Sequence, residues 1–221
     1  RSLQENIKRA ERYDNIMFDL SEDLIIQEEL FLDSKIYSID NFYKNPKEVH
    51  DYLFSGRAPL HKIHEIPTWN NVYFEDRRMS VDDDRLKIVV DYLSNIVLQQ
   101  PLTYKISTNQ TRFSKIDFND YSNNYWYPHQ DEGYNGIIYF NQDCECGTNL
   151  YENISDEESE NEHFKPWRSR EHYRFLKHIE PKYNRLVLFD GLKFLHGMNI
   201  INDRYFSEEY RKNQVFFFLK S

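Results

Sequence analysis

The pattern of apolar and polar positions changes near Pro101. Before that residue the clearest signal is helical, in residues 81–100. Apolar residues recur there at helical spacing, which predicts one buried face. They are Leu86, Val89, Val90, Leu93, Ile96 and Val97. Three aspartates at the start suit the helix dipole, and Pro101 ends the element.

A second helix is predicted just after Asn45, which can cap it, because Pro46 fits the first helical position. This helix is expected to end near Ser55 and Gly56. Residues 1–35 are polar and highly charged, and we interpret them as a peripheral helix or arm. The stretch KIYSID predicts a short strand, and residues 59–71 are expected to form a loop.

After Pro101 the apolar segments become short and rich in Tyr, Phe, Ile and Val, with Asn, Asp and Gly between them, which is typical of strands. The predicted strands are residues 102–108, 111–118, 135–141, 148–153, 184–191 and 213–220. Residues 152–180 interrupt this order and predict an insertion that is either a lid or a plain surface excursion. Helices in residues 1–100 and strands in residues 101–221 indicate one α+β domain, with helices outside an antiparallel sheet or barrel.

Composition narrows the class of protein. The 221 residues include 17 Tyr and 16 Phe, which favours a packed globular chain over disorder. The formal net charge of −9 disfavours a nucleic-acid partner, and no apolar run is long enough for a transmembrane helix. Two cysteines do not form a disulfide framework, and no signal-peptide pattern is seen, so we expect a cytoplasmic protein.

Candidate chemistry lies in the stretch YPHQDEGYNGIIYFN. Residues two apart in a strand project to the same side, so His129 and Asp131 can face one atom. His196, in a turn after an apolar strand, supplies a third ligand. Two imidazoles and one carboxylate form the facial triad that suits non-haem Fe(II). His-x-Asp alone is a short match, and two polar residues in a turn are the alternative.

A cationic side chain lies at the start of the last predicted strand. Arg211 precedes an apolar run, and a buried guanidinium needs a carboxylate partner. A dicarboxylate ligand can supply that partner, whereas a surface Glu such as Glu208 or Glu209 is the alternative. Arg204 competes for the same role from a loop-like segment.

Over residues 104–219 the chain resembles the Fe(II)- and 2-oxoglutarate-dependent dioxygenases, most closely their prolyl-hydroxylase-like branch. Four blocks carry the resemblance in the right order. They are YPHQD with GIIYFN, then CGTNLYE, NRLVLFDGLKFLHGM and RKNQVFFF. The block that is usually Gly-Gly-Thr reads Cys146-Gly147-Thr148, a change that matters only if position 146 needs a positive φ.

The resemblance implies a double-stranded β-helix (jelly-roll, cupin-like) core with the N-terminal helices packed outside. It implies that His129, Asp131 and His196 hold the iron and that Arg211 binds the distal carboxylate of 2-oxoglutarate. Tyr139 corresponds to a tyrosine that supports this carboxylate, and Tyr127 is expected to line the pocket. For both tyrosines, plain core packing is the alternative. The spacing from His196 to Arg211 is 15 residues, more than in many members, which keeps Arg204 open as the alternative arginine.

The implied activity is hydroxylation of a C–H bond with Fe(II), 2-oxoglutarate and O2, releasing succinate and CO2, with ascorbate as an optional activator. The implied substrate is a prolyl or other peptidyl residue, or a small amino-acid-like molecule. Two alternatives remain at this stage: a non-catalytic cupin-like barrel that binds a metal or ligand, and a metal-dependent hydrolase. The sequence leaves the oligomeric state open.

Overall fold

The computed structural model describes residues 3–5, 18–54, 62–67, 73–80, 83–155 and 166–220. The strands in this part of the chain are β1 (Ile25–Phe31), β2 (Ser34–Asp40), β3 (Lys62–Pro67), β4 (Tyr73–Ser80), β5 (Thr103–Phe113), β6 (Asn124–Trp126), β7 (Gly133–Tyr139), β8 (Thr148–Asn153), β9 (Trp167–Ser169), β10 (Tyr173–Ile179), β11 (Leu186–Asp190), β12 (Leu195–Met198) and β13 (Arg211–Leu219). The helical elements are α2 (Pro46–Phe54), η1 (Asp84–Leu86), α3 (Lys87–Asp91), η2 (Tyr92–Val97), η3 (Lys115–Asn123) and η4 (Arg170–His172).

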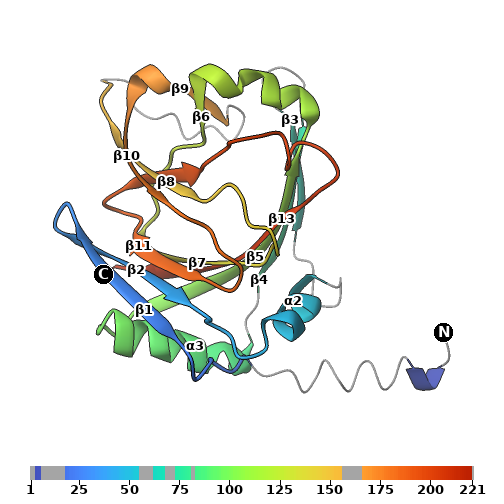
Figure 1. Ribbon diagram of the computed structural model, residues 1–221, viewed down its shortest axis with the longest axis vertical. Helices are drawn as coiled ribbons and strands as arrows, with labels where there is room; N and C mark the ends of the chain where they lie inside the picture. Colours follow the sequence, from blue (N-terminus) through green and yellow to red (C-terminus); the bar gives the residue numbers. More distant parts are fainter. Residues whose placement is uncertain are drawn as a thin grey trace.

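The strands form mainly antiparallel sheets. An eight-stranded sheet has the order β1-β2-β11-β7-β13-β5-β4-β3, a three-stranded sheet has the order β10-β8-β12, and β6 pairs with β9. The three-stranded sheet lies over one face of the large sheet, while α2 and α3 lie against the other face (Figure 1). A mostly antiparallel fold with few helices and two facing sheets is consistent with a jelly-roll-like architecture.

Strand alternation gives the large sheet two different faces. On β13, Phe216 and Phe218 are fully buried in the cluster that also contains Val89 and Leu93 of the helical layer. The intervening Val215 and Phe217 line a cavity on the opposite face. The period of two therefore separates a helix-packed core from the face that carries the candidate chemistry.

The helix predicted over residues 81–100 is present but irregular. Asp83 caps its first turn, because its side chain accepts a hydrogen bond from the backbone N–H of Arg85 at 3.0 Å. Residues 92–97 form a π-helical turn, in which Leu98 N donates to Leu93 O. This wider turn moves Ile96 out of register with the buried face, so that Ile96 is 62% exposed. The prediction that Ile96 is buried was wrong, whereas the other five apolar positions are buried as expected.

Several predicted elements differ from the structure. Within residues 1–35 we expected a helix or arm, but Ile25–Phe31 is a strand, β1. Residues 62–67, expected in a loop, form β3. Within the insertion predicted at 152–180, residues 156–165 lie outside the described residues, and the described part contains β9 and β10, which pairs with β8. The two strands expected over 102–118 are one long strand, β5, followed by η3.

These errors share a physical reason. β1 is an edge strand that pairs only with β2, and nearly all of its residues are exposed, so burial imposes no alternation on its sequence. β10 also lies at a sheet edge, and a bulge between Phe175 and Lys177 breaks its period of two. The start of α2 at Pro46 and the strand β8 agree with prediction.

Cys146 adopts a left-handed backbone conformation with φ of 56°. The dioxygenases that the sequence resembles usually have a glycine at this position. Cys146 therefore places a side chain on a backbone conformation that favours glycine. The Cys146 side chain is buried in a cluster with Trp126 and Phe206, and this packing offsets part of the conformational cost.

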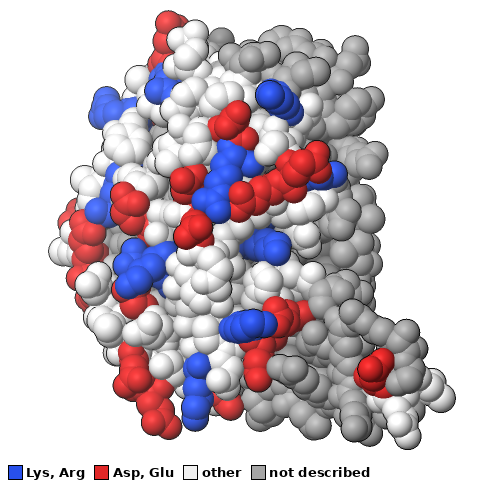
Figure 2. All heavy atoms as spheres, turned by 45° about the vertical axis from the view of Figure 1, so that its right-hand side comes forward, with Lys and Arg blue, Asp and Glu red and all other residues white. Residues whose placement is uncertain are grey.

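The surface carries both signs of charge. On the face shown in Figure 2, acidic and basic side chains are interspersed over the described residues, so this face has no uniformly basic area. In the part of the chain that the structure describes, no helix has the length and apolar content needed to span a bilayer.

Candidate metal centre

The three predicted ligands meet at one place between the two sheets. His129 and Asp131 lie between β6 and β7, and His196 lies on β12 of the three-stranded sheet. His129 N donates to His196 O at 3.0 Å, and His196 N donates to His129 O at 2.8 Å. Asp131 N donates to Gly191 O at 2.9 Å. Backbone hydrogen bonds thus hold all three residues in place independently of their side-chain contacts.

The side chains converge on a small volume. His196 Nε2 lies 2.9 Å from Asp131 Oδ2, and His129 Nε2 lies 3.8 Å from the same oxygen. One ligand atom from each residue lies within 4.8 Å of the others. Ligand atoms about 2 Å from one ion are at most about 4 Å apart, so the three side chains would need only a small closing movement to bind a single ion.

Both imidazoles have a defined orientation. His129 Nδ1 donates to Tyr127 O at 2.7 Å, and His196 Nδ1 donates to Phe194 O at 3.1 Å. Since a carbonyl oxygen only accepts, Nδ1 of each ring carries the proton, and in a neutral ring Nε2 presents its lone pair. Two lone pairs and a carboxylate oxygen therefore face one another, an arrangement that a cation stabilises.

Electrostatics keep the ligands in their metal-binding protonation states. Burial and the neighbouring His196 lower the pKa of His129 to about 4, so its ring is neutral at pH 7. Burial alone would raise the pKa of Asp131. The nearby His196 and His129 rings and the Asn135 amide, which donates to Asp131 Oδ2, outweigh burial and hold this pKa well below its usual range. Metal binding at neutral pH would therefore displace no proton from either residue.

Asn135 is a residue of the site that the sequence did not reveal. It lies on β7, is 2% exposed, and its Nδ2 donates to Asp131 Oδ2 and approaches His196 Nε2 at 2.9 Å. Its Oδ1 is buried without a hydrogen-bond partner in the described structure. An unsatisfied amide oxygen beside three converging ligand atoms fits a site that is completed by a bound group. The only hint in the sequence was its position two residues before Ile137 in a predicted strand. The structure shows that both residues line the cavity.

The centre opens into a cavity of about 780 Å³. The lining combines alternate residues of β5 and β13 with the three candidate ligands. The lining residues include Ser107, Asn109, Thr111, Trp126, Tyr127, His129, Asp131, Asn135, Thr148, Pro166, His196, Arg211, Asn213, Val215 and Phe217. This volume lies within the range typical of small-molecule sites.

Arg211 lines this cavity at the start of β13. Its Nε donates to Cys146 O at 3.2 Å, and its guanidinium carbon lies 5.7 Å from the centre of the Tyr139 ring. In the described part of the chain Arg211 forms no ion pair with a carboxylate, and neither Glu208 nor Glu209 is its partner. A half-buried guanidinium without such a partner is suited to bind an acidic ligand.

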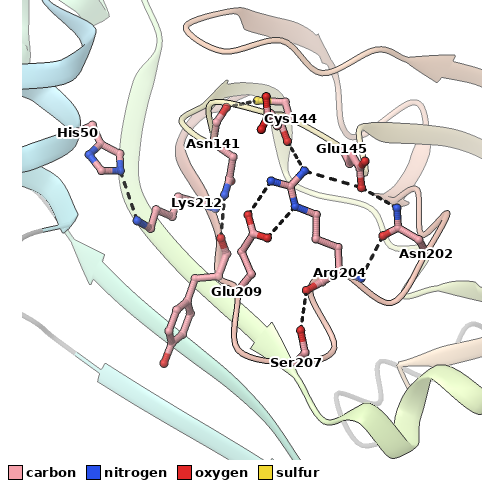
Figure 3. Close-up of polar contacts among 11 residues, drawn as sticks. His50, Asn141, Cys144, Glu145, Asn202, Arg204, Ser207, Glu209 and Lys212 are labelled. Carbon is pink, nitrogen blue, oxygen red and sulfur yellow. Dashed lines mark hydrogen bonds and ion pairs between the residues drawn. The ribbon is translucent and has the colours of Figure 1, made fainter.

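Arg204, the competing arginine, is already engaged (Figure 3). Its Nη2 lies 2.7 Å from Glu209 Oε1, its Nε donates to Glu209 Oε2 at 2.8 Å, and its Nη1 lies 3.8 Å from Glu145. The hydrogen bonds to Glu209 raise the pKa of Arg204, which is the expected effect of a strong ion pair. Arg204 is not among the residues that line the cavity, and its contacts hold neighbouring loop residues together.

The two tyrosines differ in position. Tyr127 lines the cavity, and its ring centre lies 4.8 Å from that of His129. Tyr139 is 2% exposed, lies outside the cavity lining, and its hydroxyl hydrogen-bonds with Thr148 Oγ1 at 2.8 Å. Thr148 itself lines the cavity. Tyr139 thus contacts two residues that line the cavity, Thr148 and Arg211, without lining it itself. Direct contact of Tyr139 with a ligand stays a prediction.

Comparisons with known proteins give distant neighbours. No protein-family model matches the sequence, and no curated protein matches it significantly. The structure is similar to an oxidoreductase of the 2OG-Fe(II) oxygenase family from Burkholderia pseudomallei, with 11% sequence identity, a TM-score of 0.43 and 80% of each chain covered. It is also similar to the Fe(II)/α-ketoglutarate-dependent dioxygenase TqaL, with 10% identity, a TM-score of 0.37, and 98% of this chain and 87% of that chain covered. Scores of this size do not assign the chain to a family or an activity.

Proposed function

We propose that the protein is a non-haem Fe(II)- and 2-oxoglutarate-dependent oxygenase with a double-stranded β-helix core. The observation that carries the proposal is the convergence of His129, Asp131 and His196, with both imidazoles fixed through Nδ1 and Nε2 facing the carboxylate. Two imidazoles and one carboxylate leave the remaining metal positions open, which suits Fe(II) oxygenase chemistry.

The cosubstrate site is proposed at Arg211. The centre and Arg211 lie in the lining of the same cavity, and no protein carboxylate in the described chain neutralises this guanidinium. Arg211 would bind the distal carboxylate of 2-oxoglutarate by paired hydrogen bonds, and Tyr139 and Thr148 would support the arginine from behind.

When bound, Fe(II) and 2-oxoglutarate supply the oxidising chemistry, in which the cosubstrate becomes succinate and CO2 and one oxygen atom of O2 enters a substrate C–H bond. The protein's part is to hold the ligands in place and to shield the centre. Phe189 packs against His196 with ring centres 5.0 Å apart, and Trp126, Val215 and Phe217 make the cavity wall partly apolar. An apolar wall limits the water that reaches a reactive centre.

The proposed substrate is an amino-acid-like molecule or a peptidyl residue, and the prolyl-hydroxylase-like branch stays a prediction. A cavity of about 780 Å³ has room for a cosubstrate and a side chain of this size. A screen of free amino acids and short peptides would identify the substrate as the compound that raises succinate release above the uncoupled background.

The test of the activity uses anaerobic protein loaded with Fe(II) and 2-oxoglutarate. We expect a weak visible charge-transfer band and, on admission of air, slow release of succinate without added substrate. Asp131→Ala should abolish both signals. Asp143→Ala removes the same charge from an exposed loop position and should leave both unchanged. Absence of the band and of succinate from the wild type would refute the oxygenase, and hydrolysis supported by zinc without 2-oxoglutarate would replace it with a hydrolase.

A further inference from the structure

The chain segment that leads into His129 is paired, residue by residue, with the segment that follows residue 165. β6 and β9 form an antiparallel ribbon in which Trp126 pairs with Trp167 and Tyr125 with Arg168. Just beyond the ribbon, Tyr127 N donates to Pro166 O at 2.5 Å. Pro166 also lines the cavity. Residues 166–168 therefore contact the backbone immediately before the first candidate metal ligand.

Arg168 makes two contacts with this segment. Its Nη1 donates to Pro128 O at 2.8 Å, and its guanidinium carbon lies 5.0 Å from the centre of the Tyr127 ring. The first contact is a charge-assisted hydrogen bond, and the second is a cation–π contact. Arg168 thus holds the two residues that directly precede His129.

The held segment is strained and is linked to the His129 ring. Tyr127 has φ of 45°, a left-handed conformation that a bulky residue rarely adopts. This conformation directs Tyr127 O to His129 Nδ1 at 2.7 Å, and the Tyr127 ring packs against the His129 ring. Because the strained conformation sets the imidazole orientation, contacts that hold it also hold the metal ligand.

We propose that Arg168 is a positioning residue for the metal centre, which keeps His129 Nε2 directed at Asp131 by fixing Tyr127 and Pro128. The proposal rests on the proposed metal site, because metal is what His129 is oriented to bind. Pro166, which lines the cavity and accepts a hydrogen bond from Tyr127 N, contacts the same strained segment.

The ribbon has aromatic anchors besides Arg168. Trp126 and Trp167 pack edge to face with ring centres 4.8 Å apart, and Phe206 packs against Trp126 at 5.5 Å and Trp167 at 6.0 Å. These buried rings anchor β6 and β9 in the aromatic cluster with Phe113. Removal of the Arg168 side chain should consequently leave the fold in place.

Arg170, the first residue of η4 directly after the ribbon, offers a control. Its guanidinium carbon lies 4.8 Å from the Tyr125 ring centre, and its Nε donates to Asn124 O at 3.2 Å. Arg170 makes the same two kinds of contact with Tyr121, whose carbonyl accepts from Nη2 at 3.3 Å and whose ring centre lies 5.9 Å from the guanidinium carbon. These contacts reach residues 121, 124 and 125 instead of 127 and 128. Arg170→Ala should therefore remove equivalent chemistry without releasing His129.

The experiment titrates the metal-free protein with Co(II) and follows its d–d absorption. We expect Arg168→Ala to weaken Co(II) binding by about 10-fold or more, the usual effect of removing an outer partner of a metal ligand. Arg168→Lys keeps the charge but loses the planar fork and should be intermediate. Arg170→Ala should bind within about twofold of the wild type, and thermal unfolding of the metal-free variants should be similar.

A second measurement needs no metal. In protein labelled with 15N in histidine, the His129 ring should be in the Nδ1-protonated form in the wild type and in Arg170→Ala, and should lose this preference in Arg168→Ala. Equal Co(II) affinity for Arg168→Ala and wild type, with an unchanged His129 tautomer, would overturn the positioning role. Failure of the wild type itself to bind Co(II) would instead overturn the proposed metal site.

Discussion

At the scale of single residues, His129 and His196 are distinguished by the partner of Nδ1. Each donates this proton to a backbone carbonyl two residues earlier in the chain, Tyr127 O or Phe194 O. His50 and His178 instead place Nδ1 against side chains, at Asp51 and Asn149. A carbonyl partner fixes the tautomer without adding a charge, so each Nε2 is left as a lone-pair donor facing the cavity.

Arg211 and Arg204 also differ at this scale, in the ligand that each is expected to bind. Arg211→Ala should raise the 2-oxoglutarate requirement by roughly 30-fold or more, since loss of one partner of a buried charge pair costs about 2 kcal/mol or more. Metal affinity should change little, because no contact joins Arg211 to a ligand residue. The measurement is a titration of Fe(II)-loaded protein with 2-oxoglutarate under anaerobic conditions.

Arg204→Ala is the control for this prediction. Its partners are Glu209, Glu145 and the carbonyl of Asp143, so the variant should lower thermal stability and leave the 2-oxoglutarate requirement unchanged. If the requirement rises in Arg204→Ala and stays constant in Arg211→Ala, the cosubstrate site lies at the other arginine.

Part of the site could be predicted from the sequence. The spacing of His129 and Asp131, and a third ligand after an apolar strand, are local patterns with a chemical reason. Asn135 was missed because an asparagine before an apolar run resembles a turn residue, and only the cavity-facing side of β7 shows its role. No local pattern marks Arg168, since its target, the carbonyl of Pro128, lies 40 residues away in the chain.

At the scale of elements, α2 and β13 are joined by a polar contact within an aromatic surface. Lys212 Nζ lies 3.4 Å from His50 Nε2, as Figure 3 shows, and His50 Nδ1 lies 3.1 Å from Asp51 Oδ1. Burial and the charge of Lys212 lower the pKa of His50 despite the opposing effect of Asp51. The neutral His50 ring packs against Phe54 and Phe140 with ring centres 5.1 and 6.3 Å away.

A pH dependence of stability follows from this pKa. Because the pKa of native His50 lies below 6.5, the unfolded chain binds a proton first as the pH falls through 6.5. The contribution of His50 is therefore present above that pH and is lost below it. With chelator present, the free energy of unfolding should fall more between pH 7.5 and 5.5 for the wild type than for His50→Gln, as measured by urea titration.

His129 provides the internal reference for this comparison. Its pKa is also lowered, so it contributes to the pH dependence in the same direction, but it is unchanged in His50→Gln and cancels in the difference. Equal slopes for the two proteins would show that His50 does not titrate abnormally in the native state.

The start of α2 and the strand β8 were predictable elements. In α2 the buried residues Val49 and Leu53 lie one turn apart, which gives its sequence a helical period. β8 is buried over Thr148–Tyr151, and it was predictable as a short strand-forming segment and not from alternation. β1 and β10 lie at sheet edges, where exposure or a bulge removes alternation. The helical interpretation of residues 1–35 failed at β1 for this reason, because mixed charge without burial is compatible with either element.

At the scale of the whole molecule, the candidate centre joins two sheets. Asp131 lies directly before β7 of the eight-stranded sheet, whereas His196 lies on β12 of the three-stranded sheet. Away from the centre, the described contacts between these sheets include the buried cluster with Ile137, Leu150 and Val215. A metal bound to both residues would be a direct bond between the layers, so metal occupancy should stabilise the entire domain and not only the loop that carries His129.

Mn(II), which is stable in air, tests this coupling. At 100 times its dissociation constant a ligand adds about 2.7 kcal/mol, which for a protein of this size raises Tm by roughly 5–10 °C. Hydrogen exchange should slow on β12 and at the start of β7 together, because the ion joins both. Asp131→Ala should show neither effect, while Asp143→Ala should behave as the wild type. Protection confined to residues near His129, with no change on β12, would mean that His196 is not a ligand and that the two sheets are held without a metal, by their apolar contacts and the backbone hydrogen bonds between His129 and His196.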